Sequence, residues 1–594
     1  MLSAQNDTPT LSHQMNRDEE APTEDAECKK GGWITFPFIT VGVAGLTIAV
    51  SGWMTNLIVY LIQQFNIKSI QATQISNVVN GCTNFFPIVG AIIADSFLGN
   101  FMVISISSFI SFLGLILLTL TATLHSLKPT HCQESAETCE APSNFQFAIL
   151  YSALTLVSIG MGGTRFTIAT MGADQFDKAK DQGTFFNWYF FTLYFATVIG
   201  LTGIVYVEND VSWGLGFGLC LVVNGIGLAI FMSGKGYYRY VKPKGSPFTG
   251  LARVLVATFR KKKVPISSES KDYYHGYIGE TNSEVLVPTR SFRFLNRAAI
   301  KTEGDKQNGQ LRESWSLCTV QQVEDLKNLI RIFPLWSTSI FLTTPIAIQS
   351  GLMVLQALSM DRHIGAHFQV PAGSFLIFTL LSTAISLSVI DRVLFPLWNT
   401  VTRHPMTPLE RLGIGHILNI IGMAGSAIVE SRRLHVVHSH GLTHQPGAVA
   451  PMSAFWLVTP LAIIGVGEAF HFPGQVALYY QEFPVSLRST ATATISLVIA
   501  IGYYLGTALV DLIQRVSGWL PDNINEGRID NVYWVLVVIG AVNFGYYITC
   551  AVSYTYQSVE NQKKKSESTR NGWCNLYVER TKSSRKVYAK SDRN

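Results

Sequence analysis

The sequence predicts an all-α polytopic membrane protein with twelve membrane-spanning helices. Of its 594 residues, 48% are hydrophobic and only 14% are charged, whereas soluble domains usually carry about 25% charged residues. The mean hydropathy is +0.26 over the whole chain. Apolar stretches long enough to cross a bilayer recur along its length. These three observations exclude an ordinary soluble enzyme or binding domain.

The predicted spans fall into two groups of six. They lie near 36–62, 73–94, 101–124, 145–170, 186–207 and 213–233, and then near 331–358, 370–395, 411–431, 452–479, 489–513 and 532–556. The chain is therefore expected to comprise a disordered acidic tail (1–32), a first bundle (33–233), a linker (234–330), a second bundle (331–557) and a basic tail (558–594).

Basic residues predict the orientation of the spans, because Lys and Arg accumulate on the cytosolic side. The linker contains the run Arg260–Lys263, and the C-terminal tail contains Lys563–Lys565. The short segments near 208–212 and 516–530 are acidic instead. Both termini and the linker are therefore expected in the cytosol, which an even number of spans requires.

Within the linker, residues 247–264 predict a basic amphipathic helix suited to the inner leaflet. Its apolar residues are Leu251, Val254, Leu255 and Phe259, and its basic residues include Arg253, Arg260 and Lys261. Membrane lipid is thus an expected partner. A basic run also fits nucleic-acid binding, but twelve spans argue against that class, and no nucleic-acid partner is expected.

Two loops on the predicted outer face leave alternatives open. Cys132 and Cys139 bracket one of them, and a disulfide is permitted in that compartment. Four histidines crowd the segment after the ninth span, namely His435, His438, His440 and His444. They fit a metal site or a pH sensor, although a solvated loop explains them more simply. No CxxC pair or other metal or cofactor motif is present, so no cofactor is expected.

Arg165 lies deep inside the fourth span. Nine residues separate it from Asp174, which places it roughly 13 Å from the polar end of a helix and near the middle of a hydrocarbon core about 30 Å thick. Such a charge normally faces a bundle interior or a water-filled pathway. Arg165 is therefore predicted to be a fixed positive charge in a solute pathway, with a structural arginine bonded to backbone carbonyls as the alternative.

A weak internal repeat relates the two bundles. IGMGG at 159–163 recurs as IGVGE at 464–468, and Asp95 at the end of the second span has its counterpart in Asp391. Repeats of six helices with a site at their interface are a transporter architecture. Arg165 and Glu468 are expected to be the only charges in the apolar interiors of the spans, and so to form a minimal site on opposite helices.

Further candidates surround this pair. Thr47 and Gln349 are polar residues of the first and seventh spans and are expected to contact the substrate. Asp95, Asp391 and Arg392 are expected to have gating or structural roles at span ends. Pro473 predicts a local irregularity in the tenth span whose free carbonyls join the cavity.

Several motifs carry a resemblance that runs from Trp33 to about Tyr556. They are NLIVYL at 56–61, ADSFLG at 94–99, GADQFD at 172–177, FFNW at 185–188, SFRFLNRAAI at 291–300, WSLCTVQQVEDLKNLIRIFPLW at 315–336, MDR at 360–362 and ERLGIG at 410–415. On these motifs the chain resembles the plant nitrate- and peptide-transporter family of the major facilitator superfamily. Arg165 stands where that family usually has a lysine, and Glu468 matches its acidic position in the tenth helix.

The first span departs from the family pattern. The family usually carries Glu-x-x-Glu-Arg or -Lys, the residues associated with proton coupling, and the matching positions here are Val43, Leu46 and Thr47. An apolar first helix, Arg165 and the opening GWITFPF resemble the nitrate excretion subgroup. That resemblance implies an anion transporter of the plant plasma membrane, with nitrate or chloride as candidates and no proton coupling through the first helix.

Physical chemistry agrees with this implication. Val43 and Leu46 cannot exchange a proton, and the guanidinium of Arg165 stays charged. Its planar fork suits nitrate through two parallel hydrogen bonds, whereas chloride satisfies only the charge. A transporter of a larger anionic metabolite, hormone or peptide and an anion-sensing receptor remain as alternatives. No catalytic motif suggests an enzyme.

Overall fold

The computed structural model describes most of the chain. The described residues are 30–130, 141–241, 247–267, 269–276, 288–289, 291–302, 305–307, 310–311, 315–365, 367–445, 447–483 and 491–554. Cys132 and Cys139, the N-terminal tail up to residue 29 and the tail beyond residue 554 lie outside these ranges. The disulfide expected as one alternative therefore falls on residues that are not described.

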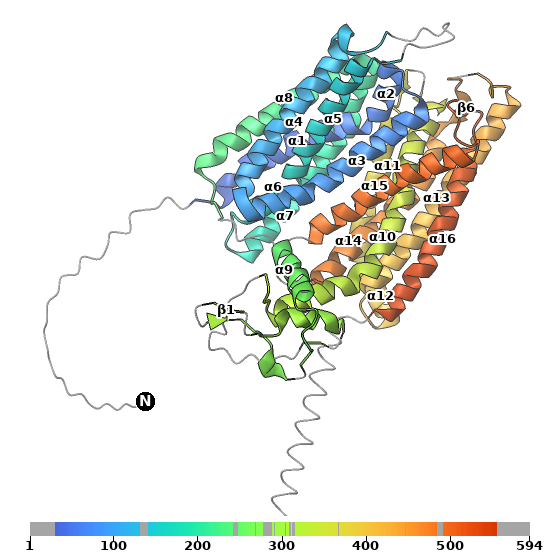
Figure 1. Cartoon of the computed structure of the whole chain (residues 1–594). Coiled ribbons are helices and arrows are strands. Elements are labelled where there is room, and N and C mark those ends of the chain that lie inside the picture. The colour runs from blue at the N-terminus through green and yellow to red at the C-terminus, as the bar shows by residue number, and fades with distance from the viewer. Residues whose placement is uncertain are drawn as a thin grey trace, which may run out of the picture.

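The described chain is almost entirely helical and forms two bundles side by side, with the linker at one end of the pair (Figure 1). The helices of the first bundle are α1 (Phe36–Thr55), α2 (Leu57–Phe65), α3 (Ser69–Ile93), α4 (Asn100–Thr123), α5 (Asn144–Thr164), α6 (Thr167–Ala173), α7 (Ala179–Ile199) and α8 (Trp213–Ser233). Those of the linker and the second bundle are α9 (Pro247–Arg260), α10 (Val320–Leu358), α11 (Leu376–Val389), α12 (Phe395–Thr402), α13 (Pro408–Ser439), α14 (Val458–Glu482), α15 (Ala491–Val516) and α16 (Ile529–Ser553).

Short strands occur only in connecting segments of the described chain. They are β1 (Lys306–Gln307), β2 (Gln310–Leu311), β3 (Met360–Asp361), β4 (His363–Ile364), β5 (Phe368–Gln369) and β6 (Ala450–Ser453). β1 pairs with β2 and β4 with β5, both antiparallel, and β3 pairs in parallel with β6. The β3–β6 pair ties the segment after the seventh span to the segment before the tenth.

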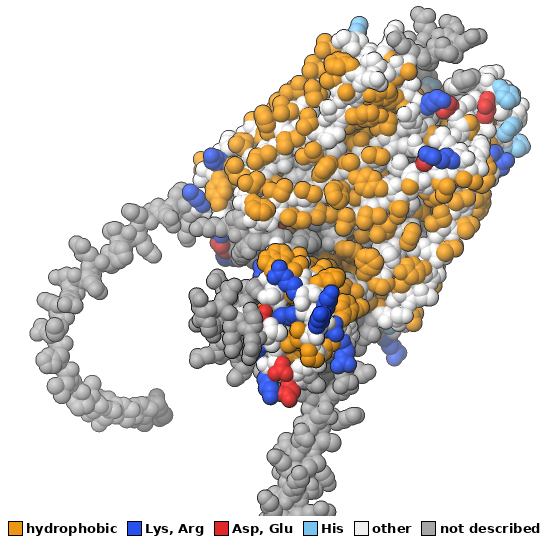
Figure 2. Space-filling view, in the orientation of Figure 1, with side chains coloured by type: hydrophobic (Ala, Val, Ile, Leu, Met, Phe, Trp, Pro, Cys, Tyr) orange, Lys and Arg blue, Asp and Glu red, His pale blue; other side chains and the backbone are white. Residues whose placement is uncertain are grey.

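Twelve helical segments of the described chain are long and apolar enough to cross a membrane. Figure 2 shows hydrophobic side chains over the visible face of the bundles and basic side chains gathered over the linker. The predicted class, an all-α membrane protein with two groups of six spans, is confirmed.

Two spans extend beyond the predicted ranges because polar turns prolong them. α10 begins at Val320, eleven residues before the predicted start at 331, and Thr319 and Gln322 form a capping box there. Such a box satisfies the free N–H groups of a first turn, so it starts the helix in the polar linker. α13 continues to Ser439, so His435 and His438 lie on the helix and not in a loop as predicted.

The internal repeat has a structural counterpart at the ends of the second and eighth spans. α3 is prolonged by the π-helical segment η2 (Ala94–Leu98), and α11 by the π-helical segment η11 (Ile390–Leu394). Asp95 and Asp391 are the second residue of their segments. π-helical turns are generally rare, and these two occur at matching positions, as the six-plus-six repeat predicts, although two more such segments, Gly200–Ile204 and Val207–Val211, lie in the fifth span.

The linker has a small hydrophobic core of its own. Val254 and Ala257 of α9 pack with Leu295, Ala298 and Ala299 and with the first turns of α10. The predicted amphipathic helix is therefore present, but its buried face is Val254 and Ala257, while Leu255 and Phe259 are exposed. Lys261, predicted to be part of the basic face, is instead buried.

Lys261 forms a buried ion pair in this linker core. Its Nζ lies 2.8 Å from Asp305 Oδ2 and also donates to the carbonyl of Ile300. Burial alone would raise the pKa of Asp305, but the hydrogen bonds from Lys261 and Thr302 outweigh it and hold this pKa below its usual value. A depressed carboxyl pKa stabilises the fold above the unfolded pKa of about 3.9, and this contribution is lost as pH falls through the folded value.

Replacing Lys261 by methionine is expected to unfold the linker locally at neutral pH. The substitution leaves Asp305 buried without its cation, which typically costs about 3–5 kcal/mol. Hydrogen–deuterium exchange should show faster exchange in η8 (Arg293–Ala299) and in α9, with the spans unchanged. The exposed neighbour Lys262 provides the matched control. Equal exchange in Lys261→Met and Lys262→Met would contradict the structural role of this pair.

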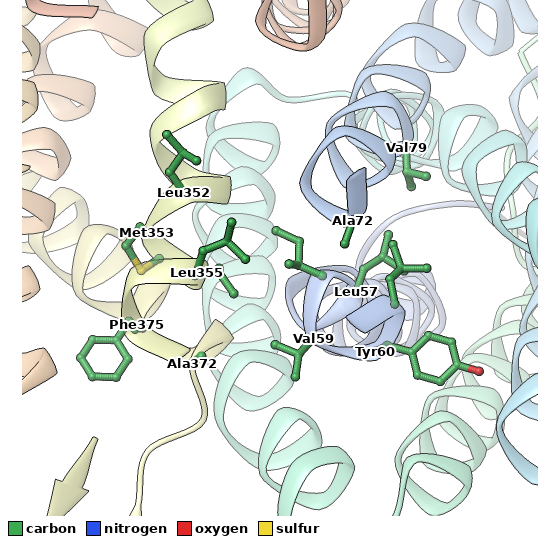
Figure 3. Close-up of a cluster of buried hydrophobic side chains, with 14 of the residues drawn as sticks. Leu57, Val59, Tyr60, Ala72, Val79, Leu352, Met353, Leu355, Ala372 and Phe375 are labelled. Atoms are coloured by element: carbon green, nitrogen blue, oxygen red, sulfur yellow. The ribbon is translucent and has the colours of Figure 1, made fainter. Parts of the chain in front are cut away.

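A hydrophobic cluster joins the two bundles at the end opposite the linker (Figure 3). Side chains of α2 and α3 face side chains of α10 and the segment before α11. The labelled members are Leu57, Val59, Tyr60, Ala72, Val79, Leu352, Met353, Leu355, Ala372 and Phe375. All of them are buried. Leu355 faces Leu57 and Val59 across the interface, whereas Tyr60, Met353 and Phe375 point into their own bundles and support it (Figure 3). This cluster, here called the apolar seal, closes that end of the interface between the bundles.

Polar contacts reinforce the apolar seal. Ser374 Oγ donates to the carbonyl oxygen of Leu201 in the first bundle at 2.7 Å. Gly373 lies so close to the first span that an added Cβ would be 2.8 Å from the carbonyl oxygen of Thr55. The backbones of the two bundles thus touch here, and any side chain at position 373 would force them apart.

Candidate functional site

Arg165 lies at a break in the fourth span. α5 ends at Thr164 and α6 begins at Thr167. The two preceding glycines bring the helix against its neighbours: an added Cβ would lie 2.2 Å from Phe86 Cβ at Gly162 and 1.8 Å from Ser107 Oγ at Gly163. This side of the helix is therefore packed against α3 and α4, and Arg165 lies on the side that lines a cavity.

The guanidinium of Arg165 is held by a neutral group. Nη1 donates a hydrogen bond to Asn84 Oδ1 of α3 at 2.9 Å. Tyr189 of α7 donates to the carbonyl of Arg165 at 3.4 Å, and the guanidinium lies 5.9 Å from the ring centre of Phe166. Among the described residues no carboxylate forms an ion pair with Arg165. Its charge is therefore positioned without being neutralised.

The cavity lies between the two bundles and has a volume of about 410 Å³. Residues of α1, α3, α5, α6 and α7 line it from the first bundle, and residues of α10, α14 and α15 line it from the second. Its polar lining residues are Thr47, Ser51, Asn80, Thr83, Asn84, Thr164, Arg165, Tyr189, Thr197, Thr343, Glu468 and Tyr503. The side chain of Arg165 has solvent-accessible surface. Because Arg165 lines this cavity, that accessible surface faces the cavity between the bundles.

The three first-span positions that depart from the family pattern all line this cavity. Val43 and Leu46 are 3% and 6% exposed and present apolar surface, and Thr47 presents a hydroxyl. The wall that faces Arg165 from the first span thus has no ionisable group. This arrangement leaves room for a mobile anion to act as the counter-ion of Arg165.

Glu468 lines the same cavity from α14. Arg165 and Glu468 are therefore brought to one site, although no ion pair joins them in this conformation of the described chain. Tyr503 of α15 interacts electrostatically with both charges. An aromatic hydroxyl near a cation and a carboxylate is suited to bridge either of them to a bound solute.

The other predicted site residues have different places. Gln349 is buried in α10 and is not among the residues that line the cavity. Asp95, Asp391 and Arg392 lie in the π-helical segments at the ends of their spans, and Asp391 and Arg392 are exposed. Pro473 lies inside α14, which continues past it to Glu482.

The expectation that Arg165 and Glu468 are the only charges inside the spans is wrong. Glu430 and Arg433 of α13 form an ion pair with both side chains fully buried, and Glu208 at the end of the fifth span is 1% exposed. Arg433 was missed because α13 continues beyond the predicted span of 411–431, and Glu430 was missed because it lies at the last turn of that predicted span and not in its apolar interior. Glu208 was missed because it lies in an acidic segment that reads as a loop.

The Glu430–Arg433 pair belongs to a network in which each partner is bonded. Arg433 donates to Glu430 at 2.7 and 2.9 Å and to Asn525 Oδ1 at 2.6 Å. Gln356 donates to Glu430 at 2.7 Å and accepts from Tyr533 at 2.7 Å. The network joins α10, α13 and α16 and lies outside the cavity. Its role is therefore to hold the second bundle together.

Some cavity residues were not predicted, although a signal was present. Asn80, Thr83 and Asn84 follow a three- and four-residue spacing in an otherwise apolar helix, which places them on one face. Tyr189 and Tyr503 carried no such signal, because tyrosines are common throughout these spans.

The four candidate histidines are all described, and no group of three or more metal-ligating side chains occurs in the described chain.

Comparison with known proteins agrees with this architecture. The family model described as PTR2, POT family, matches residues 101–526. The chain is 53% identical over 550 residues to Protein NRT1/ PTR FAMILY 2.7 of Arabidopsis thaliana, covering 92% of this chain and 97% of that protein. It is 50% identical over 561 residues to Protein NRT1/ PTR FAMILY 2.6 of the same plant, covering 94% and 99%.

Solved structures share the fold at low sequence identity. An auto-inhibited POT family peptide transporter matches with a TM-score of 0.63 and 17% identity, covering 88% of this chain and 97% of that one. The POT family transporter PepTSo matches with a TM-score of 0.63 and 16% identity, covering 88% and 99%.

Proposed function

The chain belongs to the POT family of membrane transporters, and from that premise we propose that it carries a small inorganic anion, foremost nitrate. The members of this family are transporters and not enzymes. The observation that carries the proposal is Arg165, which lines a cavity shared by both bundles and is held by the neutral amide of Asn84. A fixed cation without a fixed counter-ion favours a mobile anion at the same place.

The geometry around Arg165 favours a planar oxyanion. Asn84 engages one terminal nitrogen, and the remaining N–H groups of the guanidinium match two oxygens of nitrate in one plane. Thr47 lines the same cavity and supplies a hydroxyl group, whereas the hydroxyls of Thr164 and Tyr189 donate to backbone carbonyls in this conformation. Chloride satisfies the charge but uses neither the planar fork nor its directionality, so it is the weaker inorganic candidate.

A larger organic anion is the second candidate, and the volume of the cavity favours it. About 410 Å³ falls in the range of pockets that bind drug-sized ligands, about 300–1,000 Å³. Nitrate would then occupy only a part of the cavity beside Arg165 and Asn84. A flux assay in which organic monocarboxylates compete with nitrate distinguishes the two candidates, because strong competition favours the organic anion. Anion binding without flux would favour a sensor instead of a transporter.

We further propose that the first span takes no part in proton coupling, because Val43, Leu46 and Thr47 line the cavity without an ionisable group. A cell interior that is negative drives an uncoupled anion outward with about 2.3 kcal/mol per charge and 100 mV. Facilitated, low-affinity efflux through the plasma membrane is the function this arrangement supports.

In proteoliposomes, an imposed proton gradient is therefore expected to produce no uphill nitrate accumulation. An imposed membrane potential should drive nitrate toward the positive side, because the anion moves as a charge. Voltage-clamp recording with nitrate, chloride and pH varied separately measures the same property in cells. Accumulation of nitrate against its gradient on acidification would overturn uncoupled transport.

The orientation proposed for the chain puts the linker and both termini in the cytosol and the apolar seal on the outer side. In this arrangement the conformation is closed to the outside. Epitope tags inserted near Glu303 and at the C-terminus should be protected from antibody in intact cells, whereas a tag near His440 should be reached. Labelling of the Glu303 tag from outside would reverse the orientation.

A further inference from the structure

Glu208 is a buried carboxyl that the proposed transport cycle does not use. It lies in the π-helical segment η5 (Val207–Val211) and is 1% exposed. Its Oε2 accepts a hydrogen bond from Asn56 Nδ2 at 3.1 Å. Within the described chain no lysine, arginine or histidine forms an ion pair with it. A buried ionised carboxylate is normally paired with a cation, so the usual reason for its presence does not apply.

Two acceptor atoms of this pair lack a hydrogen-bond partner among the described residues. They are Glu208 Oε1 and Asn56 Oδ1, and both are buried. If the carboxyl is ionised, both atoms are acceptors and neither satisfies the other. If Oε1 carries a proton, the O–H group becomes a donor, and the amide oxygen of the residue already bonded to Glu208 becomes its acceptor. One proton then satisfies both atoms.

We propose that Glu208 is a proton-binding site whose neutral carboxyl forms a two-bond pair with the carboxamide of Asn56. In this pair Nδ2–H of Asn56 donates to Oε2, and Oε1–H of Glu208 donates to Oδ1. The step is the addition of one proton from water to the carboxylate, and no other bond changes. The proposal rests on the geometry of the first bundle and holds whichever anion is carried.

None of the titratable groups near Glu208 in the described chain is a cation that could neutralise its carboxylate in place of a proton. The titratable groups with which it interacts are Tyr60 of α2 and Cys220 of α8, and Tyr60 is hydrogen-bonded to Thr121. Gly216 of α8 lies so close that an added Cβ would be 2.2 Å from Glu208 Cγ. No space is left at that side for another charged side chain.

The position of the pair connects the proton to the apolar seal. Asn56 is the residue between α1 and α2, where the first helix is interrupted. The preceding Thr55 touches Gly373, and Leu201 in the same span as Glu208 accepts the hydrogen bond of Ser374. Both contacts cross between the bundles. Protonation of Glu208 therefore stabilises the break between α1 and α2 and with it the closed seal. The proton stays bound there and is not carried with the anion.

Infrared difference spectroscopy of the purified protein tests the protonation directly. The wild-type protein at neutral pH is expected to show a carbonyl band of a protonated carboxylic acid that is absent in Glu208→Gln. The matched control is Asp210→Asn, an exposed acidic residue of the same segment, which should retain the band. Identical spectra for the wild type and Glu208→Gln would overturn the proposal.

A second measurement tests the link to the seal. Ser374→Cys is introduced into the wild type and into Glu208→Gln, whose amide N–H replaces the O–H donor. The measured quantity is the rate at which an impermeant thiol reagent labels the protein with Glu208, divided by the rate for the protein with Glu208→Gln. This ratio of rates should rise with external pH, by up to about tenfold per pH unit for one released proton. Because both proteins carry the same cysteine, the titration of its thiol affects both rates and does not change the ratio. If the ratio of the two labelling rates does not change with pH, the link between Glu208 and the seal is refuted. If the ratio changes as expected but the flux assay shows no preference for nitrate, only the proposed substrate is refuted.

Discussion

Alanine at position 165 is expected to reduce anion flux to the level of empty vesicles while leaving expression and thermal stability near those of the parent. Arg165 is the only cation among the residues that line the cavity in the described chain. Hydrogen bonds to a charged group contribute about 1.5–3 kcal/mol each, so loss of two weakens anion binding by roughly a hundredfold or more. Nitrate flux and binding of the purified protein measure both effects.

The fold should tolerate this change because, within the part of the chain that the structure describes, Arg165 has no ion-pair partner to leave uncompensated. Asn84 loses one bond, but its amide lines the cavity and can bind water. Arg165→Lys should keep part of the flux, since the charge remains and the planar fork is lost. The matched control is Arg432→Ala, an exposed arginine that does not line the cavity. Nitrate flux in Arg165→Ala equal to that of the parent would show that the proposed site is wrong.

Glu468 provides a finer test of the same site. If Arg165 approaches Glu468 in the empty carrier of another conformation, Glu468→Gln removes a competitor of the anion. Affinity should then rise while turnover falls, and the double variant with Arg165→Ala should resemble Arg165→Ala alone. Additive effects of the two substitutions would separate the two residues.

Methionine at position 433 is expected to destabilise the second bundle by about 3–5 kcal/mol, because it leaves Glu430 buried without its cation. It also removes the bond to Asn525. The measurement is thermal unfolding of the purified protein in detergent, together with its yield. This effect should be the largest on the stability of the membrane-spanning bundles among the substitutions considered.

The adjacent arginine offers a matched control for Arg433→Met. Arg432 is exposed and stacks over the ring of Trp456 at 4.9 Å, so Arg432→Met should change stability little. Combining Arg433→Met with Glu430→Leu should recover part of the loss, since no buried charge is then left alone. Equal unfolding temperatures for Arg432→Met and Arg433→Met would show that the buried pair is not structural.

The spans could be predicted because the bilayer imposes a length and a polarity on each of them. Their polar ends could not, since capping groups decide where a helix starts. Thr319 and Gln322 extend α10 into the linker, and α13 continues through a charged turn to Ser439. The hydropathy of a window records neither effect.

The site could be predicted in part for a similar reason. A charge deep in a span is rare enough to be noticed, which identified Arg165 and Glu468. The amide that holds Arg165 comes from residue 84, 81 positions away, and no local pattern connects them. Glu430 and Arg433 are also charges deep in a span, and both side chains are fully buried. Their hydrogen-bond network nevertheless makes them structural and not part of the transport site. Burial of a charge alone therefore does not distinguish a transport site from a structural pair.

The continuity of α10 has a mechanical consequence. Its 39 residues correspond to about 58 Å of helix, nearly twice the thickness of the hydrocarbon core at about 30 Å. The linker core packs on the first turns of this helix, so α9 is anchored to the second bundle through α10. If the bundles rock against each other, α10 tilts, and its end in the linker moves sideways beneath the first bundle. Any load on the linker from the cytosol is thus transmitted to the wall of the cavity through a single helix.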